Sequence, residues 1–175
     1  MSARAESLAK KYEAKAAELT ATIQKLSDAD WKKVTAAEKW PVGVTAHHVA
    51  GGHEPISGIV KTLAAGQSIP NFTPAMLDEM NAKHAKDFAG CTKAETLALH
   101  EKGVKTAAAV VRGLSDADLE KSMDWFGGKN TERGILLFIV RHAAEHLGQS
   151  IAYARFAGIV PPWTEDAQKK PPEKK

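Results

Sequence analysis

Two histidines four residues apart follow the longest unbroken apolar run of the chain, and this arrangement restricts the possible folds most strongly. The run begins at Ile135, and a helix continuing through it would place residues at steps of three or four on one face. That face comprises Ile135, Ile139, His142, His146, Gln149 and Tyr153. We expect it to point into a core, because three arginines fall on the opposite face: Arg133, Arg141 and Arg155.

A histidine pair on an inward helix face has two chemical explanations. Residues four apart lie one turn apart with Cβ atoms about 5–6 Å from each other, so His142 and His146 can direct ring nitrogens at one metal ion. Alternatively, they form a core pair, since buried imidazole nitrogens must find hydrogen-bond partners. In either case, the rest of the chain has to bury this helix.

The composition indicates an all-α protein. Ala, Lys, Glu and Leu are abundant, and aromatic residues make up only 6% of the chain. A chain of 175 residues is most simply one domain with a sizeable core. We assign this domain to residues 1–165 and expect the Lys- and Pro-rich residues 166–175 to be a disordered tail.

Apolar periodicity, capping residues and helix stops outline five helical segments. We expect them at residues 4–26, 41–65, 74–88, 93–113 and 130–158, which predicts a four-helix bundle with one additional short helix. Residues 125–128 are expected to form a loop. The run Leu-Ser-Asp-Ala-Asp occurs at 26–30 and again at 114–118, where it caps a short following turn. Two similar helix stops and an internal repeat explain these copies equally well.

Charge and hydropathy exclude several classes of function. The formal net charge of +3 is carried by residues 169–175, and the body of the chain has no basic stripe with interleaved aromatics, so we expect no nucleic-acid partner. The longest apolar run, residues 135–140, is too short to cross a membrane. We expect a cytoplasmic protein, because residues 1–15 lack the apolar core of a signal peptide and Cys91 is a lone cysteine.

The helix expected at residues 41–65 carries three further histidines. Of His47, His48 and His53, His48 has the best claim to the inward face. The adjacent pair Gly51-Gly52 lowers helix propensity, which is explained if a neighbouring helix or a ligand comes close. Two more histidines have charged neighbours in the sequence and are expected at the surface: His84 and His100.

The segment His142-Ala-Ala-Glu145-His146 also matches H-x-x-E-H, a zinc-peptidase pattern. In that pattern the Glu is the general base, and a carboxylate well downstream completes the zinc site. Only 29 residues follow His146, mostly helix end and tail, which leaves little room for that carboxylate. Glu145 has two explanations. It acts as a general base or supports the metal ligands, or it is a solvent-exposed charge that pairs along the helix, and the second explanation is at least as good.

Four short motifs, taken in order, resemble those of the DinB-like family of metal-binding four-helix bundles. They are Trp40-Pro-Val-Gly-Val-Thr-Ala-His47-His48-Val-Ala, Asp78-Glu-Met-Asn81-Ala, Leu114-Ser-Asp-Ala-Asp-Leu119 and His142-x-x-x-His146-x-Gly148-Gln149. The resemblance covers about residues 31–162. It implies that His48, His142 and His146 bind one divalent metal ion. Zinc, nickel, iron and copper all suit such a set.

The resemblance also implies a type of activity. Family members of known activity include thiol-dependent transferases and isomerases, so we expect metal-dependent transfer of a thiol or another group, with a small-molecule substrate and a low-molecular-weight thiol. A metal-dependent hydrolase and a non-catalytic metal-binding stress-response module are the alternatives. Cys91 has no obvious base beside it and is a poor built-in nucleophile. Bundles of this family commonly pair, and we expect a homodimer with three interface candidates: Trp125, Phe126 and Trp163.

Overall fold

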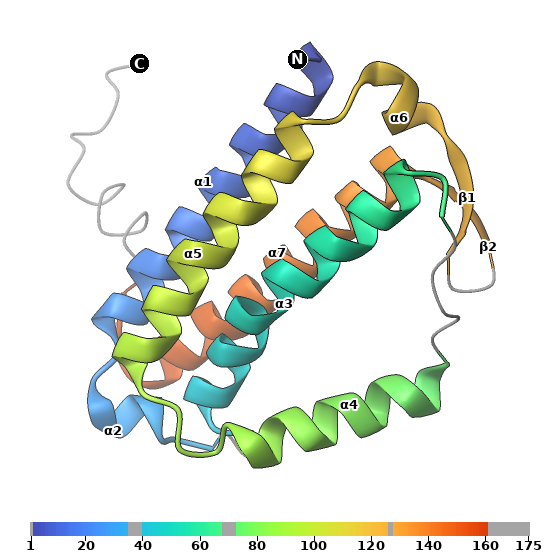
Figure 1. Cartoon of the computed structure of the whole chain (residues 1–175). Coiled ribbons are helices and arrows are strands. Elements are labelled where there is room, and N and C mark those ends of the chain that lie inside the picture. Colours follow the sequence, from blue (N-terminus) through green and yellow to red (C-terminus); the bar gives the residue numbers. More distant parts are fainter. Residues whose placement is uncertain (1, 35–39, 68–72, 126–127, 161–175) are drawn as a thin grey trace, which may run out of the picture.

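The computed structural model describes residues 2–34, 40–67, 73–125 and 128–160. Its body is an all-α bundle of four long helices, as the composition predicts (Figure 1). These are α1 (Ala3–Lys25), α3 (Val42–Ala64), α5 (Lys93–Arg112) and α7 (Glu132–Phe156). Helices α1 and α3 each pack against both α5 and α7, so the four helices enclose a common core.

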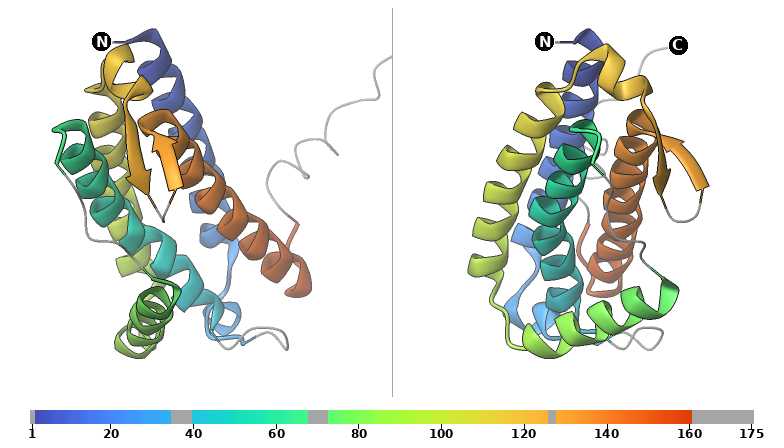
Figure 2. Two further views of the ribbon diagram at one scale, coloured as in Figure 1. Left: turned by 90° about the vertical axis from the view of Figure 1, so that its right-hand side faces the viewer. Right: turned by 45° about the vertical axis from the view of Figure 1, so that its right-hand side comes forward.

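Three shorter helices and a hairpin complete the described chain. Helix α4 (Pro74–Asp87) is the additional helix expected from the sequence, and it runs across one end of the bundle rather than along it (Figures 1 and 2). Helices α2 (Asp28–Trp31) and α6 (Asp116–Glu120) are single turns. Strands β1 (Ser122–Trp125) and β2 (Gly128–Thr131) pair antiparallel. This hairpin corrects the expectation of a plain loop, and residues 166–175 lie outside the described residues.

The repeated Leu-Ser-Asp-Ala-Asp run forms the same local structure twice. The hydroxyl oxygen of Ser27 accepts a hydrogen bond from the Asp30 backbone N–H, and the Asp30 carboxylate accepts one from the Ser27 N–H. Ser115 and Asp118 make the same reciprocal pair at the start of α6. Each copy therefore closes a long helix and caps a one-turn helix, as the sequence predicts.

Small residues allow the long helices to approach closely. Ala5, Ala9 and Ala16 of α1 are buried, and larger side chains such as Leu19 and Ile23 fill the spaces between helices.

Arg112 of α5 binds both carboxylate oxygens of Glu13 on α1, at 2.8 and 2.7 Å. No helix in the described part of the chain is both long enough and apolar enough to span a membrane.

Candidate metal centre

The bundle brings together histidines from two helices that are far apart in the sequence. The rings of His48 on α3 and His146 on α7 have centroids 5.3 Å apart and planes inclined by 72°. Both side chains are partly buried. His142 lies one turn before His146 on α7, and its side chain is outside the described part of the structure. Two of the three predicted ligands are thus neighbours, and the third belongs to the same helix as one of them.

His146 is held by the residue three positions further along α7. Its Nδ1 lies 2.7 Å from Oε1 of Gln149. An amide oxygen can only accept, so Nδ1 carries the hydrogen and donates it. In a neutral ring, Nε2 then carries the lone pair, which is the arrangement found in metal-binding histidines whose other nitrogen donates to an acceptor.

Aromatic rings surround His48 on the side towards α4. Trp40 meets the His48 ring edge-on with centroids 5.4 Å apart, and the ring of His84 lies 5.2 Å from that of His48. Trp40 and His84 are themselves stacked at 6.2 Å. His84, expected at the surface, is half-buried, because its ring packs against the rings of Trp40, His47 and His48. A Cβ at Gly51 would lie 3.7 Å from Cε1 of His84.

His47 joins the same cluster from the buried side of α3. Its ring stacks on Phe88 with centroids 4.0 Å apart, and its Nδ1 lies 3.3 Å from Nε2 of His84. Burial lowers the pKa of His47 below its ordinary value, which Glu95 partly opposes. Burial and the neighbouring His47 lower the pKa of His84, which Asp87 partly opposes. Both rings are therefore neutral near pH 7.

A second pair of histidines lies in the core and has a different role. Nδ1 of His53 lies 2.5 Å from the Tyr12 hydroxyl, and Nε2 of His53 lies 2.8 Å from Nδ1 of His100. Nε2 of His100 lies 3.1 Å from the carbonyl oxygen of Ala16. His100 is 2% exposed, so the expectation of a solvated side chain is wrong.

The helical spacing of α5 indicates that His100 is buried, although its neighbours in the sequence are charged. Steps of three or four from His100 lead to residues that are all buried: Thr96, Gly103 and Ala107. Gly103 faces His53 so closely that a Cβ added there would lie 2.7 Å from the His53 Cβ. His53 and His100 are thus a hydrogen-bonded core pair, the arrangement that the sequence left open for His142 and His146.

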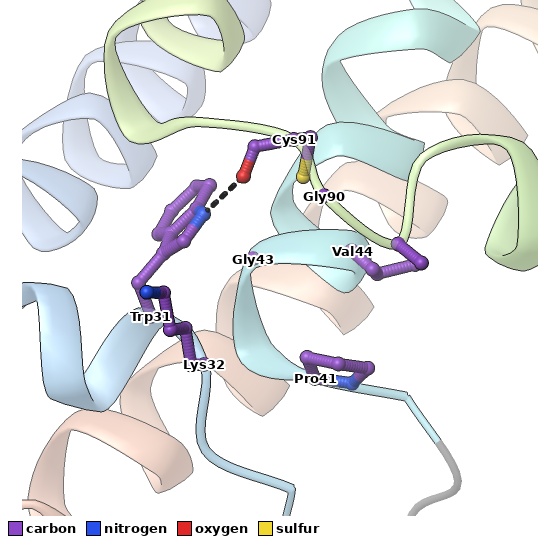
Figure 3. A pocket seen from close by; sticks show the side chains of 8 residues that line it. Trp31, Lys32, Pro41, Gly43, Val44, Gly90 and Cys91 are labelled. Atoms are coloured by element: carbon purple, nitrogen blue, oxygen red, sulfur yellow. Dashed lines mark hydrogen bonds between the residues drawn. The ribbon is translucent and has the colours of Figure 1, made fainter.

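Glu145 and Cys91 do not contribute a charged group to the cluster around His48. Glu145 is exposed. Cys91 lines a separate cavity of about 150 Å³, where its carbonyl oxygen accepts a 2.8 Å hydrogen bond from the Trp31 indole (Figure 3). Burial raises the pKa of the Cys91 thiol, a nearby Thr96 opposes this, and Glu95 adds to it. The thiol is therefore protonated near pH 7 and weakly nucleophilic.

The described side chains alone do not complete a metal site. Among them, no group of three His, Cys, Asp or Glu residues is arranged to hold an ion. The facing pair His48 and His146 supplies two nitrogens, so a three-histidine site requires the side chain of His142.

A four-helix bundle with histidines from α3 and α7 facing each other defines the class of protein. The sequence model of the DinB superfamily matches residues 11–150, which span α1 to most of α7. The chain therefore belongs to the DinB superfamily. None of the curated proteins is similar enough to the chain to count as a match.

Proposed function

We propose that the protein binds one divalent metal ion through His48, His142 and His146. The observation that carries the proposal is the pair of facing rings of His48 and His146, 5.3 Å apart on adjacent helices. The hydrogen bond from His146 to Gln149 supports it, because it assigns the lone pair of His146 to Nε2. Neutral imidazoles suit zinc, nickel or iron.

The chemistry proposed for this site is transfer of a thiol or another group to a small-molecule substrate. A divalent ion bound by three imidazoles retains open positions and favours the deprotonated form of a bound thiol or water. Gln149 fixes the orientation of His146, and Trp40 limits access to His48 from the side of α4. The thiol comes from a low-molecular-weight cosubstrate, because Cys91 is protonated and lines a different cavity.

The ligand assignment is tested by replacing His48, His142 and His146 with Ala, one at a time. We expect purified wild-type protein to carry about one metal ion per chain and each variant to carry almost none, since two imidazoles bind far more weakly than three. Metal content is measured by atomic emission spectrometry. Glu145→Gln is the matched control, because this exposed residue lies on the same helix between two of the ligands. Full metal content in His48→Ala would contradict the assignment on α3.

The reaction class is tested by assaying the metal-loaded protein with several small thiols and a panel of electrophiles. We expect turnover that requires a thiol and is lost in His146→Ala. Turnover of an ester or amide without a thiol would instead establish the hydrolase alternative. The absence of any turnover from a protein that does bind metal would favour a non-catalytic binding module.

We also propose that the protein forms a homodimer. Trp125 is the last residue of β1, while Phe126 and Trp163 are outside the described residues. Light scattering at micromolar concentration should give a mass close to 38 kDa, about twice the 18.8 kDa of one chain. A mass of one chain, with and without added metal, would contradict this proposal.

A further inference from the structure

We infer that the C-terminal segment of the chain docks the side chain of Trp163 into a groove between α1 and α7. The described part of the chain ends at Val160, three residues before this tryptophan. The inference goes beyond the proposed function, because none of the residues that line the groove is a proposed metal ligand.

The groove is large enough for an aromatic side chain. Helices α1 and α7 pack side by side and run in the same direction (Figures 1 and 2). The groove between them has a volume of about 370 Å³. This is the share of more than ten water molecules, at about 30 Å³ each. Both helices line it: Lys15 and Glu18 from α1, and Ala144, Leu147, Gly148 and Ile151 from α7.

The part of the groove formed by α7 is apolar and open. Leu147 is 5% exposed and belongs to the core, and Ile151 packs against the same core cluster. Gly148 leaves a space between them, because nothing lies within 4 Å of the position that its Cβ would occupy. An apolar side chain above Gly148 would therefore remove this surface from water.

The chain leaves α7 close to this groove. Gly158 has a φ of +78° and the N–H of Ile159 donates to the Ala154 carbonyl at 2.8 Å, which is the Schellman arrangement that ends a helix. Ile159 then packs against the core cluster that contains Leu147. The carbonyl oxygen of Val160 accepts a 3.1 Å hydrogen bond from Nζ of Lys25, the last residue of α1. The described chain thus ends beside both helices that form the groove.

The distance from Val160 to the groove matches the length of chain that reaches Trp163. The two prolines that follow Val160 favour an extended chain with a rise of about 3.1 Å per residue, so Trp163 is about 9 Å further on. Glu18 lies two turns before Lys25 on α1, about 10 Å along the helix axis. A segment that runs back along α1 therefore brings Trp163 level with Glu18, at the groove.

The charges of the segment complement those of α1. Lys11, Lys15 and Glu18 are spaced to share one face of α1. Lys11 is exposed and the side chain of Lys15 is 43% exposed. Glu165 and Asp166 follow Trp163, so a segment that continues along α1 would place two carboxylates opposite these two lysines. This complementarity favours the chain's own C-terminal segment as the occupant of the groove.

The docked arrangement changes two parts of the molecule. Trp163 would pack on the turn of α7 that follows His146, and the C-terminal segment would then support the helix that carries two of the proposed ligands. Trp163 would also be buried within its own chain, which leaves Trp125 and Phe126 as the candidates for the homodimer interface.

The inference is tested by ¹⁹F NMR on metal-free, full-length protein labelled with 5-fluorotryptophan. The chain has four tryptophans, and the resonance of Trp163 is the one lost in Trp163→Phe. We expect this resonance to be shifted from its position in urea, and to return to that position in Gly148→Leu, whose side chain fills the groove. Gly58→Leu is the matched control, because Gly58 is an exposed helical glycine with an equally open Cβ position. Ala144→Leu fills the same groove from an exposed position and serves if Gly148→Leu does not fold.

A double-mutant cycle provides a second measurement. Trp163→Ala should lower the Tm by about 2–6 °C, because the aromatic ring no longer covers the groove. The same substitution should have almost no effect in Gly148→Leu and its full effect in Gly58→Leu. Equal losses in all three backgrounds would overturn the inference.

Three NMR results would also overturn it. A Trp163 resonance at its urea position in the wild-type protein would mean that the segment is not docked. A shifted resonance that neither Gly148→Leu nor Ala144→Leu moves would mean that Trp163 docks elsewhere. A shift that disappears on dilution, together with the dimer seen by light scattering, would mean that the groove holds the segment of a second copy. Because these measurements use metal-free protein, their failure is separate from that of the proposed metal site.

Discussion

The hydrogen bond from His146 to Gln149 shows how a single neutral side chain orients a histidine that we propose as a metal ligand. At 2.7 Å it fixes both the orientation of the imidazole and the nitrogen that carries the hydrogen. The two residues are three positions apart on α7, so the helix itself places the acceptor beside the ring. Gln149 has no charge, and it therefore adds no electrostatic attraction for competing cations.

Replacing Gln149 tests this role. We expect Gln149→Leu to raise the Kd for Zn²⁺ by about 10–100-fold, because His146 would lose the acceptor that fixes its tautomer. Isothermal titration calorimetry on the metal-free protein provides the measurement. Gln149→Glu retains an acceptor oxygen and should bind Zn²⁺ at least as well as wild type. Unchanged affinity in Gln149→Leu would show that the hydrogen bond is irrelevant to binding.

Among single residues, the sequence predicts the surroundings of His146 but not those of His84 and His100. Helical spacing places His146 and Gln149 on one face, and the structure joins them by a hydrogen bond. Spacing does not reveal that the ring of His84 packs against His47 and His48 on α3, because this depends on where α4 crosses the bundle. His100 was predicted wrongly because its charged neighbours in the sequence point away from the core while its own face is buried.

Helices α1, α3 and α5 are joined inside the core by one chain of hydrogen bonds. The Ala16 carbonyl can only accept, so His100 donates to it from Nε2 and, as a neutral ring, accepts at Nδ1. His53 then donates from Nε2 and accepts at Nδ1 from the Tyr12 hydroxyl. Neutral rings have one consistent arrangement of hydrogens along this chain, so an added proton would break a buried hydrogen bond.

This chain makes the stability of the bundle depend on pH. Burial lowers the pKa of His100 in the folded protein, while the Ala16 carbonyl partly opposes it. The unfolded chain therefore binds a proton near pH 6.5 that the folded chain does not. Stability is full above about pH 6.5 and falls as the pH decreases towards the lower folded pKa, by at most about 1.4 kcal/mol per pH unit for this histidine.

Urea denaturation between pH 7.5 and 5 provides the test. His100→Gln cannot titrate, and its amide can still donate and accept, so we expect its unfolding free energy to fall less steeply with decreasing pH than that of wild type. The comparison of slopes is needed because His47 and His84 also have lowered pKa values. The nearby pair Glu54 and Lys102 is exposed and common to both proteins. Equal slopes would mean that His100 is protonated without loss of stability.

Substitution of Gly103 tests how closely α3 and α5 approach each other. An added methyl group would lie 2.7 Å from the Cβ of His53, so Gly103→Ala should destabilise the protein by about 1–3 kcal/mol despite its better helix propensity. Gly58→Ala on α3 is the matched control, because nothing lies within 4 Å of its Cβ position. The control should gain about 0.5–1 kcal/mol. Gains of stability in both variants would contradict the close packing.

For the whole molecule, the bundle was predictable because its signals are local. Apolar periodicity gives the long helices, and the paired Ser and Asp residues mark where α2 and α6 begin. The hairpin was missed because residues 122–131 contain only one β-branched side chain, that of Thr131, although β1 and β2 pair antiparallel. The course of α4 across the bundle likewise follows from packing between distant segments, which no local pattern encodes.

Metal binding at the proposed centre should stabilise the folded protein, because its ligands come from helices that meet only when the chain is folded. Metal that binds the folded chain alone stabilises it by about 2.7 kcal/mol when the free metal concentration is 100 times Kd. For a chain of this size, that corresponds to an increase in Tm of about 5–10 °C. Differential scanning calorimetry with buffered Zn²⁺ should show this increase in wild type and none in His146→Ala. An equal increase in wild type and His146→Ala would contradict the proposed site, since His146 would then make no contribution to metal binding.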